Sequence, residues 1–469
     1  MKEILNGAEK DNKYKRLNGI EQKVNVNNVK AKNVSPGCCL RSLSWWLLVG
    51  AAALLTITLM KVGYISKDIM YHQQLTSIHV NDEVKHAEEN SADTNSLPDA
   101  GTDQVKVVSC YYNFPSEYGS RQLMPTDIHP YLCTHINVGF AVVQNKEIKL
   151  EDYHYRLLTD VEKLKQKDPH LKILLSVGGA GNDKGFSDMV IDHASRKTFI
   201  KSLKNILRNT TLDGVDLDWE FPSLHKRERQ HFSQLLREIR MEFIREKRDY
   251  LLTVATAAPQ TIVDISYDID ELNQYVDYVN IMTYDFHFYT KYTPFTGFNS
   301  PLFARPTEHM YPATLNINYT VNMYIRKGLK RDKIVVGIPT YGHTFSLVNA
   351  DNAQIGSPAS GFGSLGGSGF INYPDVCLFI KQFTSDVTVK FDDAAKVPYL
   401  YRNKEWVSYD SPRSVMDKAN FIKRNRLRGA MIYSLNADDY EGVCAREAGG
   451  DAGAKFPLLR SVKSTLLLD

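Results

Sequence analysis

The 469-residue sequence predicts an α/β fold, a closed (β/α)8 barrel of the TIM type, and two observations carry this prediction. Eight short runs of β-branched and apolar residues recur at intervals along the chain. Between these runs, apolar residues recur every three to four positions, as in amphipathic helices. Strands that are apolar enough to be covered on both faces, alternating with helices eight times, indicate a parallel barrel; an open doubly wound sheet is the alternative.

The expected strands follow one another along the larger, C-terminal part of the chain. They span 106–114, 134–143, 171–179, 212–221, 251–259, 278–286, 333–342 and 429–440. Among the intervening segments, 188–210 and 225–249 have a clear helical spacing. The gap of about 85 residues between the seventh and eighth strands is too long for one connection. Its alternation and turns predict a small α+β insertion at about 345–410, followed by the seventh helix.

An apolar segment near the N-terminus predicts a single transmembrane helix that precedes the barrel. Eighteen residues without a charge, Leu43–Met60, extend to Ile65 if Lys61 reaches toward the membrane interface, and this length can span a bilayer. A buried core helix and a cleaved signal peptide are the alternatives. Against them, the flanks are charged and no small-x-small cleavage site follows the apolar run.

The charge distribution sets the expected orientation and domain order. Residues 1–65 carry ten Lys or Arg against four acids, an excess that keeps the N-terminal side cytoplasmic. We therefore expect a cytoplasmic tail (1–42), a signal anchor in contact with lipid (43–65), a flexible stem (66–104) and an extracellular or luminal barrel (105–460), hence a single-pass type II membrane protein. The other 404 residues carry 47 basic and 50 acidic side chains, which argues against a nucleic-acid partner.

The cysteines and glycosylation sequons agree with that orientation. An even number of cysteines in an oxidising compartment suggests two disulfides with three possible connectivities, and the spacings match no zinc motif. The cysteines beyond the expected anchor are Cys110, Cys133, Cys377 and Cys444. Two sequons on the same side, at Asn209 and Asn318, predict N-glycosylation. We expect neither a metal nor a cofactor.

The fourth expected strand carries an unusual cluster of acids in the stretch LDGVDLDWEFP, residues 212–222. Residues two apart on a strand share a face, so Asp216, Asp218 and Glu220 project together, with Glu220 nearest the carboxyl end of the strand, and Trp219 points the opposite way. Barrel enzymes place their active sites at that end. A catalytic carboxylate cluster is therefore the favoured interpretation. A metal site and structural capping are the alternatives, but a calcium loop needs Gly where Phe221 stands.

The same stretch resembles a family signature. Asp213, Asp216, Asp218, Trp219 and Glu220 fit the D-x-x-D-x-D-W-E pattern of family 18 glycoside hydrolases, the chitinases and chitinase-like lectins. Supporting matches to the family come from the third and sixth strands, at Ser176, Gly178, Gly179, Met282, Tyr284 and Asp285. The resemblance covers about 105–460. It implies disulfides that join Cys110 to Cys133 and Cys377 to Cys444.

The resemblance also implies an activity, the retaining hydrolysis of β-1,4-linked N-acetylglucosamine in chitin or its oligosaccharides, with the substrate's own acetamido oxygen as nucleophile. Glu220 would protonate the leaving oxygen and later activate water. Asp218 would orient the acetamido nitrogen, and Asp216 would hold the proton that lets Asp218 turn. Tyr284 would hydrogen-bond the acetamido carbonyl, and Asp285 would contact the distorted sugar and tune Glu220. A lectin or signalling protein with little turnover is the alternative.

Departures from the family lie among the expected substrate contacts. The full set of these contacts is Tyr111, Phe114, Gly179, Ala180, Asp213, Met282, Tyr341, His343 and Tyr433. Phe114, Ala180 and Tyr433 stand where chitinases present Trp platforms, as Tyr289 does approximately, and His343 stands where many relatives carry Arg. Smaller aromatic surfaces weaken sugar stacking. They favour short or modified ligands, slow turnover or a sensing role.

A glycine-rich run offers a further motif. Gly361, Gly363 and Gly366 satisfy the G-x-G-x-x-G pattern of dinucleotide-binding folds. The run follows a Ser/Pro/Ala loop and precedes more glycines, whereas a dinucleotide site requires a strand before it and a helix after it. We therefore expect no dinucleotide site here.

Overall fold

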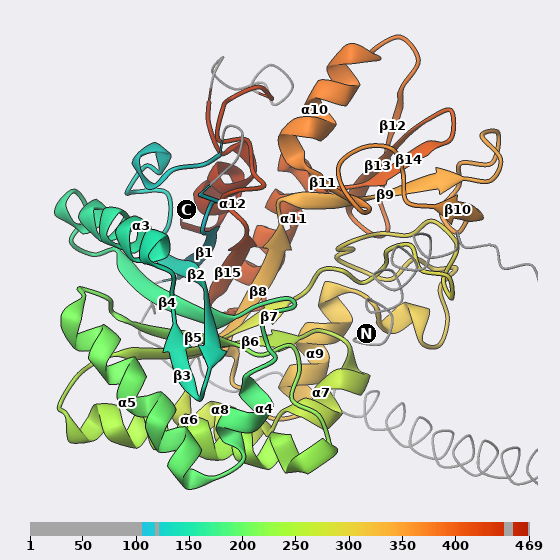
Figure 1. The fold of residues 1–469 in the computed structure, drawn as a ribbon. Coiled ribbons are helices and arrows are strands. Elements are labelled where there is room, and N and C mark those ends of the chain that lie inside the picture. Colours follow the sequence, from blue (N-terminus) through green and yellow to red (C-terminus); the bar gives the residue numbers. More distant parts are fainter. Residues whose placement is uncertain (1–105, 118–121, 445–453, 468–469) are drawn as a thin grey trace, which may run out of the picture. The chain divides into compact units, whose positions relative to one another are not determined.

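The computed structural model describes residues 106–117, 122–444 and 454–467, and its central feature is a ring of eight parallel strands (Figure 1). The ring strands are β1 (Val107–Asn113), β2 (His135–Gln144), β4 (Lys172–Gly178), β5 (Gly214–Asp218), β6 (Leu251–Ala257), β7 (Tyr278–Met282), β8 (Ile334–Pro339) and β15 (Gly429–Tyr433). Each strand pairs with the next, and β1 also pairs with β15, so the sheet closes. The predicted barrel and its eight strands are confirmed.

Helices surround the ring (Figure 1). They are α3 (Asp152–Glu162), α4 (Phe186–Val190), α5 (His193–Asn209), α6 (Glu228–Arg245), α7 (Gln260–Ser266), α8 (Ile269–Tyr275), α9 (Ile317–Arg326), α11 (Pro412–Arg424) and α12 (Pro457–Leu467). A short strand, β3 (Glu147–Lys149), forms a hairpin with β2. Single turns of 3₁₀ helix lie at Pro125–Asp127, Lys163–Gln166, His225–Arg227, Pro312–Thr314 and Arg331–Lys333.

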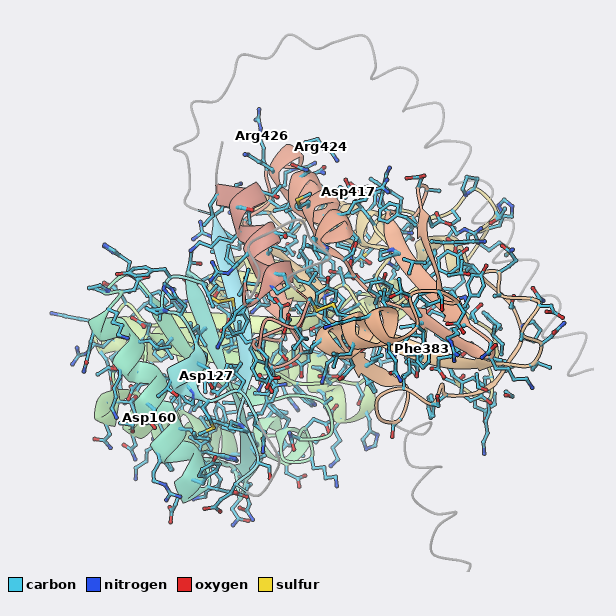
Figure 2. All side chains as sticks on the ribbon, turned by 90° about the horizontal axis from the view of Figure 1, so that it is seen from above. Asp127, Asp160, Phe383, Asp417, Arg424 and Arg426 are labelled. Carbon is cyan, nitrogen blue, oxygen red and sulfur yellow. A yellow bond between two sulfur atoms is a disulfide. The ribbon has the colours of Figure 1, made fainter. Side chains whose placement is uncertain are left out.

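Two helix boundaries differ from the sequence-based expectation. The helical pattern at 188–210 is divided between α4 and α5, because Asp192 accepts the backbone N–H of Ser195 at 2.7 Å and starts a new helix. The pattern at 225–249 becomes an α-helix only at Glu228, after the single 3₁₀ turn, because Lys226 and Arg227 have left-handed φ angles of 54° and 56°. At its far end α11 places Arg424 and the nearby Arg426 on the outer surface, where both project away from the ribbon (Figure 2).

The predicted insertion between the seventh strand and the seventh helix is present. It contains β9 (Tyr341–Leu347), β10 (Ala359–Gly361), β11 (Phe370–Asn372), α10 (Tyr373–Gln382), β12 (Thr388–Asp392), β13 (Val397–Arg402) and β14 (Glu405–Ser408). Its strands pair antiparallel in the order β10-β9-β14-β13-β12, with β11 also on β9. It starts a few residues before the expected 345, because only Thr340 separates β9 from β8.

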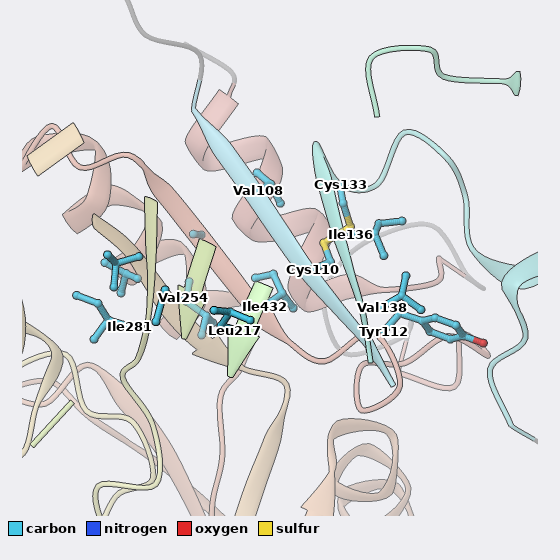
Figure 3. Packing of buried hydrophobic residues seen from close by; sticks show 14 of the residues in the cluster. Val108, Cys110, Tyr112, Cys133, Ile136, Val138, Leu217, Val254, Ile281 and Ile432 are labelled. Carbon is cyan, nitrogen blue, oxygen red and sulfur yellow. A yellow bond between two sulfur atoms is a disulfide. The ribbon is translucent and has the colours of Figure 1, made fainter. Parts of the chain in front are cut away.

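The apolar residues form separate layers on the two sides of the ring. Outward-facing residues such as Leu217, Val254, Ile281 and Ile432 belong to a large buried cluster between strands and helices (Figure 3). Tyrosines dominate a smaller cluster that contains the inward-facing Tyr111. The alternation of side chains along each strand produces this division. This division allows polar side chains to occupy the barrel interior.

Two disulfides join distant parts of the chain. Cys110 of β1 is bonded to Cys133, which precedes β2 (Figure 3). Cys377 of α10 is bonded to Cys444, which follows β15. These are the two pairs that the resemblance implies.

The expected membrane-proximal features fall largely outside the described residues. The tail, the signal anchor and the stem at 1–104 are not among them. Within the ranges given above, no helix combines the length and apolar character that crossing a bilayer requires. Both glycosylation sequons lie within the described residues. Asn209 is exposed at the end of α5, and Asn318 is half-buried in the first turn of α9.

Candidate active site

The acidic ladder lies on β5 and on the segment that leaves it. Asp216 and Asp218 are buried inside the barrel, with exposed fractions of 0% and 2%, whereas Glu220 is half-buried beyond the last strand residue. Trp219 faces the opposite way, where its ring stacks on Phe186 with centroids 5.2 Å apart and contacts Phe232 edge to face. The predicted alternation along this strand is confirmed. The apolar residues of the strand anchor it in the core. Its acids become progressively less buried from the barrel interior toward the carboxyl end of the strand.

Asp216 is the most firmly held of the three acids. Four donors surround its carboxylate: Tyr111 Oη at 2.7 Å, Ser176 Oγ at 2.7 Å, Thr253 Oγ1 at 2.6 Å and Asn280 Nδ2 at 3.2 Å. They come from β1, β4, β6 and β7. Burial raises the pKa of Asp216, and the hydrogen bonds oppose that rise. The strands of the barrel thus fix this carboxylate in place and supply hydrogen bonds that stabilise its charged form.

Asp218 lies in a different environment. Its pKa is raised well above its ordinary value, first by burial and then by the charges of Glu220 and Asp216. Its Oδ1 is buried and has no hydrogen-bond partner among the described residues. Because Asp216 faces four donors, a proton shared by the two aspartates resides on Asp218. The protonated Asp218 can then donate it or turn.

Glu220 has a proton affinity suited to acid catalysis. Burial, followed by the negative charges of Asp285 and Asp183, raises the pKa of its carboxyl to about 7. A carboxyl group with this pKa holds its proton in mildly acidic solution and can still release it. Asp183 was missed by the sequence analysis, although it follows the glycine segment at the end of β4, where barrel strands place functional groups.

Asp285 is fixed in a strained backbone conformation just beyond β7. Its φ angle is 56°, in the left-handed region that non-glycine residues rarely adopt. Its N–H donates to Asn299 Oδ1 at 2.8 Å, and its Oδ1 accepts a hydrogen bond from Tyr341 Oη at 2.6 Å. Asn299 donates in turn to the backbone oxygen of Tyr341 at 3.2 Å. Asn299, which was also missed, therefore connects Asp285 to the insertion.

His343 contacts Asp285 instead of the expected substrate groups. Its Nε2 lies 2.7 Å from Asp285 Oδ1, and its Nδ1 lies 3.2 Å from the carbonyl oxygen of Gly369. Its side chain is only 3% exposed. Both ring nitrogens of His343 thus face oxygen atoms within hydrogen-bonding distance. His343 thus supports Asp285 from behind, and its predicted contact with substrate stays a prediction.

Tyrosine rings form the inner surface at the carboxyl ends of the strands. The ring of Tyr433 lies 5.4 Å from Tyr111, 5.7 Å from Tyr284 and 6.3 Å from Tyr341, measured between centroids. Tyr433 is half-buried, and Met282 packs against the same cluster. The structure therefore brings the predicted Tyr111, Tyr284, Tyr341 and Tyr433 together.

Asp213 does not belong to this site, contrary to the prediction. It precedes Gly214, the first residue of β5, and so lies at the opposite end of the strand from Glu220. It forms ion pairs with Lys165 at 2.8 Å and Lys172 at 3.2 Å, and it accepts the backbone N–H of Ile173. These contacts join β4, β5 and the preceding helical segment at the base of the barrel. Asp213 has a structural role.

The remaining predicted contacts lie on the segments that follow β1 and β4. Gly179 donates its N–H to the backbone oxygen of Asp218 at 2.7 Å, and a Cβ on it would meet the ring of Phe140 at 2.8 Å. Ala180 is exposed. Phe114 is stacked on His154, with centroids 4.5 Å apart and the rings 8° from parallel. One face of Phe114 is thus already covered by protein.

Comparison with known proteins gives consistent matches over the barrel. Residues 107–438 match the family model described as glycosyl hydrolases family 18. Chitinase-3-like protein 2 of Homo sapiens is 36% identical over 378 residues, which cover 78% of this chain and 94% of that protein. Chitotriosidase-1 of Mus musculus is 34% identical over 376 residues, which cover 76% of this chain and 78% of that protein.

Solved structures of family members also match the barrel. Human YKL-39, described as a pseudo-chitinase with retained chitooligosaccharide-binding properties, superposes with a TM-score of 0.72 at 34% identity, covering 77% of this chain and 100% of that one. A group IV chitinase of Ostrinia furnacalis superposes with a TM-score of 0.72 at 32% identity, with the same coverage. The relatives thus include proteins described as chitinases and one described as a pseudo-chitinase.

Proposed function

Because the chain belongs to glycosyl hydrolase family 18, we propose that its barrel hydrolyses β-1,4-linked N-acetylglucosamine oligomers with retention of configuration. One observation carries the proposal: the complete set of Asp216, Asp218 and Glu220, in which the outermost carboxyl has a pKa raised to about 7. A protein that only binds sugar has no need of a buried acid with this proton affinity. The two buried aspartates behind it would otherwise destabilise the fold without any function.

Glu220 supplies the proton in the first step. Its carboxyl protonates the glycosidic oxygen as the bond to the anomeric carbon breaks, and its carboxylate then removes a proton from the attacking water. The acetamido oxygen of the substrate bonds to the anomeric carbon as the glycosidic bond breaks, and the water later displaces that oxygen from the same carbon. Because this internal nucleophile and the water attack successively from opposite faces, the product retains its configuration.

Asp218 supports the acetamido group while that bond forms. Its buried Oδ1, which has no hydrogen-bond partner within the described ranges, can accept the acetamido N–H once the side chain turns toward the substrate. The positive charge that develops on the oxazolinium ion favours an ionised Asp218, so the shared proton moves toward Asp216. The four donors around Asp216 are hydroxyl and amide groups, and hydroxyls can rotate to accept as well as donate.

Tyr284 and Asp285 complete the proposed site. Asp285 raises the pKa of Glu220 through its negative charge, and Tyr341 and His343 hold its carboxylate by hydrogen bonds to a single oxygen. The other oxygen, Oδ2, is not used by these two contacts, and we assign it to the distorted sugar. The hydroxyl of Tyr284, whose nearest described partner is the weakly accepting sulfur of Met431 at 3.8 Å, is assigned to the acetamido carbonyl.

The test compares the full-length protein with a Glu220→Gln variant on a fluorogenic chitotrioside. We expect product from the parent and none above background from the variant. Asp213→Asn is the matched control, since it changes an acid of the same motif at the other end of the strand and should retain activity. Equal rates for the parent and Glu220→Gln would contradict the proposal.

A second candidate function is oligosaccharide binding without useful turnover. The observation that favours it is the thin aromatic surface around the ladder, where Ala180 is exposed and one face of Phe114 is covered. The YKL-39 structure described above retains binding as a pseudo-chitinase. Calorimetry that detects tight binding of chitotetraose, with the ligand recovered intact after incubation, would support this candidate against hydrolysis.

The membrane location is a proposal of its own. The charge-free run within residues 43–65 and the basic excess before it support a type II anchor, with the barrel extracellular or luminal. The two disulfides suit an oxidising compartment. Protease treatment of intact membrane vesicles should leave the barrel protected if it is luminal, and glycosidase digestion should lower its apparent mass if Asn209 is modified. Release of the protein by alkaline carbonate would contradict anchoring.

A further inference from the structure

A cleft of about 700 Å³ lies between the C-terminal helix and the segments that precede two barrel strands. One wall is formed by residues 126–130, which precede β2, and by Lys167, which precedes β4. The other wall is formed by residues 454–460, where the chain enters α12. Among the described residues that line this cleft, none belongs to the carboxylate ladder or to the tyrosine cluster. The cleft is therefore separate from the proposed active site.

Basic side chains dominate the cleft. Lys167, Lys455 and Arg460 line it, and all three are exposed. Lys463 follows Arg460 by one turn of α12 and is half-buried. Because Lys167 is distant in sequence from the other three, the fold itself gathers these positive charges.

Hydrogen bonds to the backbone hold the basic residues in place. Tyr131 donates its hydroxyl to the backbone oxygen of Lys167 at 2.6 Å, and its own backbone oxygen accepts the ammonium group of Lys463. On the other wall, Arg460 Nε donates to the backbone oxygen of Lys455 at 2.7 Å. This bond uses one of the three guanidinium nitrogens. The other two have no partner within the described part of the chain and can donate to a ligand.

The cations that line the cleft have no acidic partners. Within the described ranges, Lys167, Lys455 and Arg460 form no ion pair with a carboxylate. Asp127 also lines the cleft, and Asp168 lies near Lys463. Each of these two acids accepts a backbone N–H from its own segment instead, at 3.2 and 3.1 Å. The cleft thus keeps an excess of positive charge.

Repulsion between the cations affects Lys463. Burial lowers the pKa of its ammonium group; the charge of Asp168 opposes this fall, and the charge of Arg460 adds to it. Partly buried cations elsewhere in the barrel have acidic partners, as Arg240 has in Asp277 at 2.6 Å. A negatively charged ligand would supply the partner that the cleft residues lack.

From this arrangement we propose that the cleft binds a tetrahedral oxyanion, namely the phosphate or sulfate ester group of a small ligand or glycan. A guanidinium group donates to two oxygens of such a group at once, and lysines add compact positive charges. A carboxylate ligand fits less well, because it brings a single negative charge to Lys167, Lys455 and Arg460 together. The cleft is larger than the oxyanion, so it also has room for the group that carries the ester.

This site goes beyond the proposed hydrolysis and acts independently of it. A ligand that contacts both walls binds only the folded chain, so it should raise the midpoint of thermal unfolding as its concentration rises. Turnover of chitotrioside should not change, since the cleft lies at the amino ends of β2 and β4, whereas the ladder extends toward the carboxyl end of β5.

The test measures binding of inorganic phosphate, inorganic sulfate and pyrophosphate to the full-length protein by calorimetry, with ionic strength held constant by sodium chloride. We expect saturable binding, tightest for pyrophosphate, which weakens as salt is added. Arg460→Met and Lys455→Met should each weaken binding about five- to fiftyfold. Arg424→Met is the matched control, because it removes an exposed arginine of α11 that lies on the outer surface away from the cleft (Figure 2).

The outcomes are distinct. Tighter binding of phosphate than of sulfate would assign the site to a phosphate ester, and the reverse order would assign it to a sulfate ester. Affinities that are equal in the parent, Arg460→Met and Lys455→Met would overturn the site. Equal losses in Arg424→Met and Arg460→Met would also overturn it, since they would indicate a diffuse attraction by the whole surface. Absence of binding of all three anions at low salt would overturn it while leaving the proposed hydrolysis standing.

Discussion

Three carboxyl groups within five residues of one strand have three different environments. Asp216 faces four hydrogen-bond donors. Asp218 has a buried oxygen for which the described part of the chain offers no partner, and Glu220 stands near two further acids, Asp285 and Asp183. The strand alone does not create these differences. They come from side chains on neighbouring strands and loops, which separate the proton affinities of chemically similar groups.

Asp183 provides a test of how the proton affinity of Glu220 is set. Glu220 acts as an acid when it is protonated, so activity is expected below about pH 7 and should fall as the pH rises through that value. Asp183→Asn removes a negative charge that raises the pKa of Glu220. We expect the alkaline limb of the kcat/KM profile to move to lower pH, with the acid limb unchanged. An unshifted profile in a folded variant would show that Asp183 does not act on Glu220.

The same raised pKa affects stability. The native state binds the Glu220 proton more tightly than the unfolded chain, whose glutamates titrate near about 4.3, so the free energy of unfolding falls as the pH rises from that value to about 7. Glu220→Gln removes the buried charge. The variant should be more stable than the parent by about 1 to 3 kcal/mol at pH 8 and equal to it at pH 4. Urea denaturation at the two pH values measures this difference, and a pH-independent difference would contradict it.

At the scale of elements, the segment after β7 connects the barrel to its insertion. Asn299 accepts the N–H of Asp285, donates to the oxygen of Tyr341 and receives the N–H of Phe286 on its backbone oxygen at 3.0 Å. Its own N–H donates to Ser408 Oγ of β14 at 2.8 Å. One buried residue thus connects the strained turn of Asp285 to two strands of the insertion, to β9 through its side chain and to β14 through its backbone N–H.

Removal of this side chain should affect catalysis more than folding. Asn299→Ala leaves the N–H of Asp285 unpaired, so we expect kcat/KM to fall about 10- to 100-fold, because small misplacements of catalytic groups are costly. The unfolding free energy should fall by about 1 to 3 kcal/mol.

Asn316→Ala is the matched control, since Asn316 is an equally buried asparagine that caps α9 through Tyr319 N–H at 2.8 Å. It should lose comparable stability while it keeps its activity. Equal activity losses in the two variants would argue against a positioning role for Asn299.

The sequence predicts strands and helices well because each has its own spacing of apolar residues, which can be recognised within a short segment. The ladder on β5 follows from the alternation of Asp216, Leu217 and Asp218 alone. Asp213 was placed wrongly because a motif contiguous in sequence spans the whole strand, and the strand begins at Gly214. Asn299 and Asp183 lie on loops that are distant in sequence from β5. No spacing of apolar residues indicates which strand end a loop residue will contact. His343 was found as a departure, but its partner could be identified only from the packing.

The two disulfides close loops of different length. The separation is 23 residues for Cys110–Cys133 and 67 residues for Cys377–Cys444. Loop-closure entropy assigns them about 3 and about 4 kcal/mol respectively. Paired serine substitutions should therefore destabilise the protein more at Cys377 and Cys444 than at Cys110 and Cys133. Midpoints of urea denaturation rank the two variants, and the reverse order would contradict an entropic origin.

The insertion and the barrel are also joined by a buried ion pair. Lys418 of α11 donates to Asp410 Oδ1 and Oδ2 at 2.7 and 2.8 Å and to Ser300 Oγ at 2.9 Å. Ser300 donates in turn to the backbone oxygen of Thr283, which precedes Tyr284. The segment that leaves the insertion, a barrel helix and the turn that carries the proposed site thus share one network. The position of Asp285 therefore depends on the packing of α11 and of the segment after β14 as well as on its own loop.

The closure of the ring by β1 and β15 imposes an order on biosynthesis. The first strand to leave the ribosome pairs with the last, about 320 residues later. Until β15 is translated, β1 and β8 have unpaired edges, and such edges pair readily with other chains. These edges therefore stay open to pairing with other chains through most of the synthesis of the barrel. A premature stop codon anywhere before Gly429 removes the strand that pairs with both β1 and β8, and so it leaves an unclosed sheet instead of a shorter barrel.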